Sequence, residues 1–346
     1  MDHTYTEIKS QYSALRKTFN YILSQKENLL RFYKDQAPRS LTYIGCGSSF
    51  YLCQSAEFSA RLRLSLPATA MAAGDLMLNY EHYLKVLEWT LVITPTRSGS
   101  TSEVLMAIQN VRAVQNVPVL AITCVAGSAL SKLADFTLEL PWAFDESVCQ
   151  TRTVTNLYTA NLLIIAILSG DERLIASIDA AIDGGTAYME RYESDLAQIA
   201  KENWREAVVL ADGEIQGIAR EGALAFTEIA RVPGQYYHLL DVRHGPMVLI
   251  RDKTLVVMAL NPGDLRFQKD LINDLLQKGA TVIVYSDTPM PLIPGVSLQV
   301  ALGANLDFAA RGIPFILLLQ MLSYSKAIQN GVDPDQPEGL DAWIKL

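Results

Sequence analysis

The sequence predicts an α/β protein made of two doubly wound halves in tandem, each a parallel sheet packed between helices. Short apolar strands alternate with helices from Ser40 onward, which is typical of right-handed βαβ crossovers and parallel sheets. The alternation restarts near residue 204 and each half ends in a long apolar helix, so the architecture repeats at a spacing of about 170 residues. A chain of 346 residues is long enough for two such units.

The first half is expected to follow a short helical segment. Residues 1–35 carry apolar side chains at helical spacing with charges between them, which predicts one or two amphipathic helices. We assign residues 36–170 to the first unit. Its predicted strands are Leu41–Ile44, Pro67–Ala72, Trp89–Thr94, Val119–Thr123 and Phe136–Leu140. Its predicted helices are Tyr51–Arg63, Glu103–Val114 and Asn156–Leu168.

The second half repeats this plan after a connector. Residues 171–203 are rich in alanine and charged side chains and predict a helical connector. We assign residues 204–346 to the second unit, including a C-terminal tail. Its predicted strands are Ala207–Ala211, Tyr236–Leu239, Thr254–Ala259, Thr281–Tyr285 and Leu298–Val300. Its predicted helices are Ile215–Arg231 and Pro314–Asn330.

Composition argues against several classes of protein. The formal net charge of −8 disfavours a nucleic-acid surface, which needs clustered Lys and Arg. The apolar stretches are about half the length that crosses a bilayer, so we expect no membrane segment. The first residues have neither the basic start nor the apolar core of a secretory signal, and we expect a cytoplasmic protein. A negative net charge leaves room for a small phosphorylated ligand, because a few amides and hydroxyls can hold one phosphate.

Cysteine and histidine spacing predicts neither a metal site nor a disulfide framework. The cysteines form no CxxC pair, and the histidines are scattered without zinc-ligand spacing. We expect reduced, mostly buried thiols and no metal or organic cofactor. The residues concerned are Cys46, Cys53, Cys124, Cys149, His3, His82, His238 and His244.

Two turns between a strand and a helix predict a phosphate site. In Gly45–Ser49, the sequence GCGSS, Gly47 lets the main chain approach an anion, and Ser48 and Ser49 add hydroxyls at the start of a helix. The second turn, TRSGST, contributes Thr96, Arg97, Ser98 and Thr101. Turns that follow adjacent parallel strands converge at the carboxyl edge of the sheet, where such sheets bind ligands. The alternative is ordinary helix capping by Ser and Thr, which would account for only part of this hydroxyl cluster.

The stretch Asp145–Arg152 adds further candidates. It follows the fifth predicted strand and leads into the last helix of the first half. Gln150 and Thr151 could hydrogen-bond sugar hydroxyls from this position, although the stretch alone would not establish a site.

The candidate acid–base residues lie in the second half. Glu221 and Glu228 are seven residues apart, which places them on one face of a helix about two turns from each other. The apolar residues around them favour burial over the alternative of a solvated helix face, and a partly desolvated carboxylate can move a proton between sugar carbons. His244 lies in an Arg-His-Gly-Pro loop and is a candidate acid or base, with a structural histidine as the alternative.

Together these stretches resemble the SIS (sugar isomerase) family, especially the isomerase domain of glucosamine-6-phosphate synthase and the shorter fructosamine-6-phosphate deglycases. The matching stretches occur in the order of the family and span nearly all of the chain beyond residue 40. They are GCGSS (45–49), TRSGST (96–101), SVCQTRTVT (147–155), EGALAFTEI (221–229), RHGP (243–246) and DQP (335–337).

The resemblance implies a fold of two SIS-type domains and a 6-phosphosugar substrate. It implies that Ser48, Ser49, Thr96, Ser98 and Thr101 hold the phosphate. It further implies that Glu228 is the base acting at C1–C2 and that Glu221 orients the substrate or supports the site. His244 would open the sugar ring from the other subunit of a homodimer that shares its active sites.

Departures from the synthase pattern point toward the deglycases. Ala225 stands where the synthases have a lysine, and Lys345 is displaced from the position of their tail lysine. We also expect no glutaminase domain, because the sequence shows no N-terminal nucleophilic cysteine. We therefore expect an enzyme that isomerises a 6-phosphosugar or releases the amine of a ketosamine 6-phosphate. The alternatives are a simple aldose–ketose isomerase and a non-catalytic phosphosugar-binding regulator.

Overall fold

The structure is a computed structural model that describes residues 2–342 and 346. The first half contains α1 (His3–Ser24), α2 (Lys26–Gln36), β1 (Ser40–Gly45), α3 (Ser48–Arg63), β2 (Ala68–Ala72), α4 (Ala73–Tyr83), β3 (Thr90–Thr96), α5 (Ser102–Arg112), β4 (Val119–Thr123), α6 (Ala129–Leu133), β5 (Phe136–Glu139) and α7 (Arg152–Ser169). The rest contains α8 (Glu172–Asp183), α9 (Gly185–Ala200), β6 (Glu206–Leu210), α10 (Gln216–Glu228), β7 (Gly234–Tyr237), β8 (Thr254–Ala259), α11 (Leu265–Gln277), β9 (Thr281–Ser286), β10 (Leu298–Ala301) and α12 (Gly312–Asn330).

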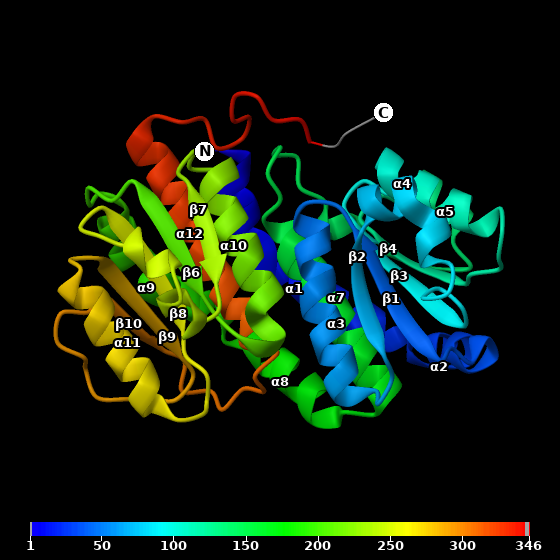
Figure 1. The fold of residues 1–346 in the computed structure, drawn as a ribbon, viewed down its shortest axis with the longest axis horizontal. Coiled ribbons are helices and arrows are strands. Elements are labelled where there is room, and N and C mark those ends of the chain that lie inside the picture. The colour runs from blue at the N-terminus through cyan, green and yellow to red at the C-terminus, as the bar shows by residue number, and fades with distance from the viewer. Residues whose placement is uncertain (1, 343–345) are drawn as a thin grey trace.

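The strands form two parallel, five-stranded sheets with the same topology (Figure 1). The first has the order β2-β1-β3-β4-β5 and the second β10-β9-β8-β6-β7. Read from the other edge, the second order becomes β7-β6-β8-β9-β10, in which β6 and β8 take the places of β1 and β3. The chain reverses its winding between the first and third strands of each sheet, so each sheet has one topological switch point. The predicted repeat of a doubly wound α/β architecture is confirmed.

Helices lie on both faces of each sheet, which explains why the central strands read as continuous apolar runs. All residues of β3 and of β8 are buried. Helices α4 and α5 cover the outer face of the first sheet with a separate cluster that includes Leu76 and Val104. The outer face of the second sheet is covered by a cluster that includes Leu271 of α11 (Figure 1).

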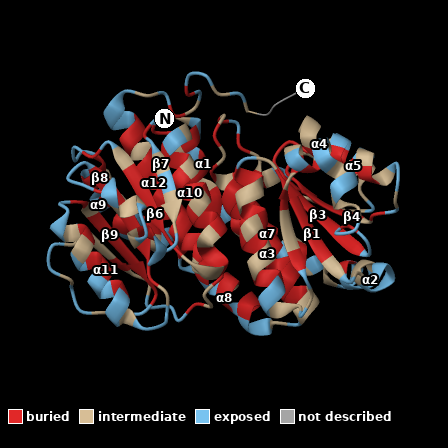
Figure 2. Cartoon of the chain, in the orientation of Figure 1, coloured by how far each residue is buried: buried red, intermediate tan, exposed pale blue. Residues whose placement is uncertain are grey.

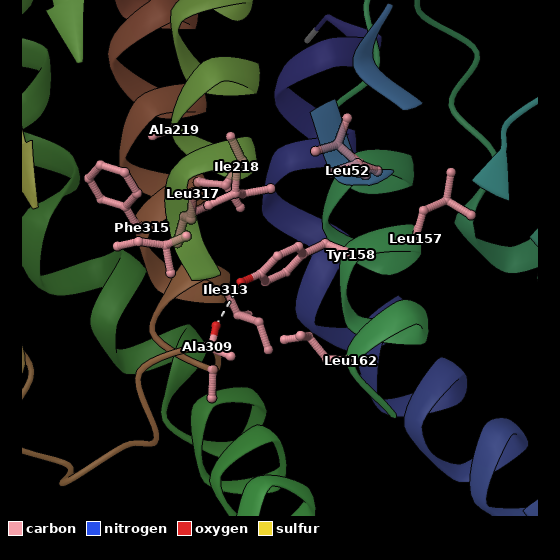
Figure 3. Close-up of a cluster of buried hydrophobic side chains, with 14 of the residues drawn as sticks. Leu52, Leu157, Tyr158, Leu162, Ile218, Ala219, Ala309, Ile313, Phe315 and Leu317 are labelled. Atoms are coloured by element: carbon pink, nitrogen blue, oxygen red, sulfur yellow. Dashed lines mark hydrogen bonds between the residues drawn. The ribbon is translucent and has the colours of Figure 1, made fainter. Parts of the chain in front are cut away.

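Helices from both halves share the space between the sheets. One continuous apolar cluster runs from Ile8 of α1 through α3, α7 and α10 to Leu322 of α12, and Figure 2 shows this central layer as largely buried. Figure 3 shows Leu52, Tyr158, Ile218 and Phe315 meeting there from four helices. The Tyr158 hydroxyl donates a hydrogen bond of 2.7 Å to the carbonyl oxygen of Ala309, which satisfies the one polar group of this buried ring.

The residues of the expected linker belong to this shared packing. Residues 171–203 form α8 and α9, and α9 packs along α12 of the second half, while α1 contacts both α7 and α12. Among the described residues, no helix has the length and apolar character needed to cross a bilayer. The four-part division at residues 35, 170 and 203 stays a proposal about how the chain is organised.

The elements differ from the sequence-based expectation in a few places. Strand β7 begins two residues before the predicted start at Tyr236, and α7 begins four residues before the predicted start at Asn156. Helices α4, α6 and α11 were not predicted. Helix α4 follows β2 without an intervening loop, so no turn residue marks its start. The sequence does contain a signal for helix α11. Asp264 is a typical N-cap residue and accepts a hydrogen bond from the Arg266 amide, and Leu271 and Leu275 lie on the buried face of the helix.

Candidate active site

A cavity of about 330 Å³ opens at the switch point of the first sheet. The turns after β1 and β3, which are adjacent strands, form much of its wall. The predicted residues among its lining are Gly47, Ser48, Ser49, Thr96, Arg97, Ser98, Thr101, Gln150 and Glu228. Its size falls within the range typical of small-molecule sites. The structure therefore brings most of the candidate residues to one place.

The first turn delivers the start of α3 to the cavity. Gly45 ends β1 in contact with the helix that follows, since a Cβ atom there would lie 2.7 Å from the carbonyl carbon of Ser49. Gly47 has a φ of +51°, a conformation that favours glycine, and precedes the first helical residue, Ser48. Ser48 and Ser49 consequently line the cavity at the positive end of a helix dipole.

The second turn is held by its own hydrogen bonds. The Thr96 hydroxyl accepts from the Gly99 amide at 3.2 Å, and the Ser98 hydroxyl accepts from the Ser100 amide at 3.1 Å. Thr101 occupies the N-cap position of α5, yet within the described chain its side chain makes no capping hydrogen bond. Because ordinary capping does not engage the Thr101 hydroxyl, that group remains available to a ligand in the cavity.

Arg97 connects the walls of the cavity. It is 3% exposed, and its guanidinium donates to the carbonyl oxygens of Ser147 at 2.7 Å, Val148 at 2.9 Å and Ala342. These bonds fix the 147–150 stretch and the C-terminal tail against the second turn. Arg97 was predicted to bind substrate, and its recorded contacts give it a positioning role in addition.

Buried carboxylates hold the 145–151 stretch in place. Asp145 accepts from the amides of Thr151 at 2.8 Å and Thr153 at 2.9 Å, while the Glu7 carboxylate accepts from the amide and hydroxyl of Ser147. Gln150 lines the cavity, whereas Thr151 is fully buried and is absent from the lining. Adjacent residues at the start of α7 thus point in different directions, which spacing alone does not reveal.

Helix α10 brings the second half to the cavity. A Cβ atom on Gly217 would lie 2.1 Å from the carbonyl oxygen of Tyr51, so the main chains of α10 and α3 approach each other closely there. Gly217, Glu221 and Glu228 lie on one stripe of the helix, because steps of four and seven residues return to nearly the same direction. The close approach at Gly217 therefore turns both carboxyl groups toward the first half.

Glu221 lies beneath the first turn. It is 2% exposed and lies close to Ser48. Burial raises the pKa of Glu221 well above its usual value, the nearby Glu228 raises it further, and the Ser48 hydroxyl acts in the opposite direction. Glu221 does not line the cavity, so it adjoins the first turn from outside the cavity wall.

Glu228 is the last residue of α10 and lines the cavity. Burial raises the pKa of its carboxyl group, and the positive charge of Arg97 partly offsets that rise. A carboxylate with a raised pKa that faces a polar cavity is suited to accept and return a proton.

Cys46 and the C-terminal tail also form part of the wall. Burial raises the pKa of the Cys46 thiol to about 11, with Glu103 adding to the rise, so Cys46 is a neutral thiol near neutral pH and a poor nucleophile. The tail residues Gly339, Leu340, Asp341 and Ala342 also line the cavity. The contacts of the tail, Cys46 and Glu103 were not predicted, since no local sequence pattern shows where a tail will pass. The displaced Lys345 lies outside the described residues.

His244 lies away from this cavity within its own chain. It belongs to the connection between β7 and β8, where its side chain is exposed and its amide donates to the carbonyl oxygen of Asp241 at 2.9 Å. Arg243 anchors the loop through Asp274 at 2.6 Å. One chain therefore brings nine of the twelve candidate residues to the cavity wall, Glu221 and Thr151 beneath it, and His244 elsewhere.

The second sheet has no comparable hydroxyl-rich turns at its switch point. Asp212 follows β6 and accepts from the Asn261 side chain at 2.9 Å and from His238 at 2.8 Å. A carboxylate at this place opposes the binding of an anion. Within the described chain, no three His, Cys, Asp or Glu side chains gather as a metal site would require.

Comparisons with known proteins agree with the fold. The SIS domain family model matches residues 36–168, the part of the chain that carries both turns. The glutamine–fructose-6-phosphate aminotransferase [isomerizing] of Pseudomonas aeruginosa is 25% identical over 354 residues, covering 96% of this chain and 57% of that protein. The Salmonella typhimurium protein of the same name is 29% identical over 352 residues, with the same coverage. The chain thus spans 57% of the length of these curated relatives.

Solved structures match over almost the whole chain. Glucosamine-6-phosphate deaminase from Thermotoga maritima superposes with a TM-score of 0.83 at 25% identity, covering 100% of both chains. Tagatose-6-phosphate ketose/aldose isomerase from Escherichia coli has a TM-score of 0.86 at 22% identity, covering 98% of this chain and 96% of that one, and this likeness concerns the fold. The chain therefore carries a SIS domain at residues 36–168, followed by a second sheet of the same topology.

Proposed function

We propose that the protein is an enzyme that acts at C1–C2 of a 6-phosphorylated sugar, with a ketosamine 6-phosphate of the fructosamine type as substrate. The observation that carries the proposal is the presence of Glu228 on the wall of the cavity formed by the two hydroxyl-rich turns. A phosphate held at the N-termini of α3 and α5 would place the rest of an open-chain sugar along the cavity. A non-catalytic sensor would have no need of a desolvated carboxylate there.

The chemistry follows from the position of Glu228. In an open-chain ketosamine, the Glu228 carboxylate would remove a proton from C1 to form a 1,2-enaminol and return the proton to C2. The product is an imine of the aldose, which water hydrolyses to the aldose 6-phosphate and the free amine. Without an amine, the same proton transfer interconverts a ketose and an aldose, so deglycation and isomerisation use one machinery. A solved relative matched from end to end carries the name of a deaminase of a 6-phosphosugar, which supports amine release.

The exposed position of His244 supports the proposal that two chains of a homodimer share each site. Its exposed loop is flanked by apolar side chains that face solvent in one chain, Leu240 at 41%, Val248 at 80% and Leu249 at 54% exposed. Such a patch suits contact with a second copy of the chain. We propose that His244 enters the cavity of the partner and acts as the acid–base group that opens the sugar ring.

The proposal is tested by measuring amine release and aldose–ketose interconversion with a panel of 6-phosphorylated sugar amines and 6-phosphosugars. We expect turnover without added metal or organic cofactor, and none with the dephosphorylated compounds. Binding of the phosphorylated compounds without turnover of any member would contradict the enzymatic proposal and favour a phosphosugar-binding regulator.

A further inference from the structure

The described wall of the cavity is rich in carboxylates. Glu103, Glu228 and Asp341 line it, against a single positively charged side chain, Arg97. The recorded hydrogen bonds of Arg97 go to the main-chain carbonyls of Ser147, Val148 and Ala342. A ligand carrying only a phosphate would therefore meet a favourable environment at the two helix N-termini and an unfavourable one along the rest of the wall.

The carboxylates of the wall can accept hydrogen bonds from a ligand. Sugar hydroxyls can donate to them, and an ammonium group additionally supplies the positive charge that the carboxylates match.

Contacts along the C-terminal tail place Asp341 on the cavity wall. The Val148 amide donates to the carbonyl oxygen of Asp335 at 2.9 Å, and Arg231 donates to that of Glu338. Arg97 holds the carbonyl of Ala342, the next residue along from Asp341. Figure 1 shows the described part of the tail, up to Ala342, crossing above α10 toward the first sheet. The tail thus delivers a carboxylate to the same cavity as the proton-transfer base.

We propose that Asp341 is a specificity-determining residue that selects 6-phosphosugars with a protonated amine at the C1–C2 end over neutral sugars of the same shape. The proposal rests on the proposed function and names the charge of its substrate. Such a ligand is dipolar, with its phosphate at the helix N-termini and its ammonium beside the carboxylates. The ammonium would also favour the ionised form of Glu228, which is the form that removes a proton.

Two open-chain probes test the proposal without turnover, because neither has a carbonyl group. They are 1-amino-1-deoxyglucitol 6-phosphate and glucitol 6-phosphate, with their affinities measured by calorimetry where the amine is protonated. We expect the wild-type protein to bind the amine about tenfold more tightly, equivalent to about 1.4 kcal/mol. Asp341→Asn should reduce this preference roughly two- to fivefold, the range of an exposed ion pair, and leave glucitol 6-phosphate affinity unchanged. High salt should weaken the preference.

The control is Glu338→Gln, which removes an exposed tail carboxylate outside the cavity and should retain the preference. Asp341→Glu should keep most of the preference for the amine probe. That result would show that the preference depends on the carboxylate charge and is not lost through an effect on folding. Equal wild-type affinity for the two probes, or an equal loss for both in Asp341→Asn, overturns the role of Asp341 while leaving the proposed function intact. Failure of both probes to bind the wild-type protein contradicts the proposed function itself.

Discussion

Gly217 of α10 lies against Tyr51 of α3 so closely that a Cβ atom would stand 2.1 Å from the Tyr51 carbonyl oxygen. This contact joins the helix that carries Glu221 and Glu228 to α3, the helix that begins at the first turn of the cavity wall. Gly217→Ala should therefore destabilise the protein by roughly 1–3 kcal/mol through overpacking and should also lower kcat. Chemical denaturation and steady-state kinetics measure the two effects.

The matched control is Gly74→Ala in α4, where an added Cβ atom meets nothing within 4 Å. Alanine favours the helical conformation by roughly 0.5–1 kcal/mol over glycine, so this variant should be at least as stable as wild type and fully active. Similar stability losses in both variants would show that the close approach at Gly217 is unimportant.

Glu228→Gln should keep the fold and the affinity for phosphosugar while turnover falls about a hundredfold or more, because an amide cannot accept the proton. The raised pKa of Glu228 also predicts a pH effect. The base must be ionised, so kcat/KM should decline as the pH falls through a pKa above the ordinary glutamate value of about 4.3. A pH–rate profile measures this limb. Full activity of Glu228→Gln would remove Glu228 from the mechanism.

Phosphate should dominate affinity. Replacing Ser49 and Thr101 together by alanine should weaken binding by a few kcal/mol, since a hydrogen bond to a charged group contributes roughly 1.5–3 kcal/mol. Ser100→Ala is the control, because Ser100 lies in the same turn but not in the cavity lining. Calorimetry with a 6-phosphosugar and its dephosphorylated form compares the variants. Equal affinity for the two sugars would show that these hydroxyls do not bind the phosphate.

A shared site predicts complementation between two inactive chains. Glu228→Gln and His244→Ala should each be inactive as homodimers, whereas co-expression should restore part of the activity. Some heterodimers would then contain one cavity with both groups intact. Differently tagged chains allow the heterodimer to be purified and assayed. A purified heterodimer without activity would show that His244 acts within its own chain or has no catalytic role.

Much of the fold could be predicted, because each buried strand is a short apolar run bounded by polar turns. All ten strands of the structure overlap predicted ones. Helix α4 was missed because nothing separates it from β2. The site was predictable where residues lie in a turn at a strand end, as Ser49 and Thr101 do, since topology alone brings such turns together. The contact of Asp341 depends on the path of the tail, and that of Thr151 on the direction of one side chain.

The continuous apolar layer between the sheets has a consequence for the way the molecule unfolds. A cut between α9 and β6 would leave each fragment with a large apolar surface that the other normally covers, so neither fragment should fold alone as an ordinary domain does. The intact chain should therefore lose both sheets in one cooperative transition. The shared core also allows the two halves to differ at their switch points. The second switch point carries Asp212, while helix α10 of the same half presents Glu228 to the cavity at the first.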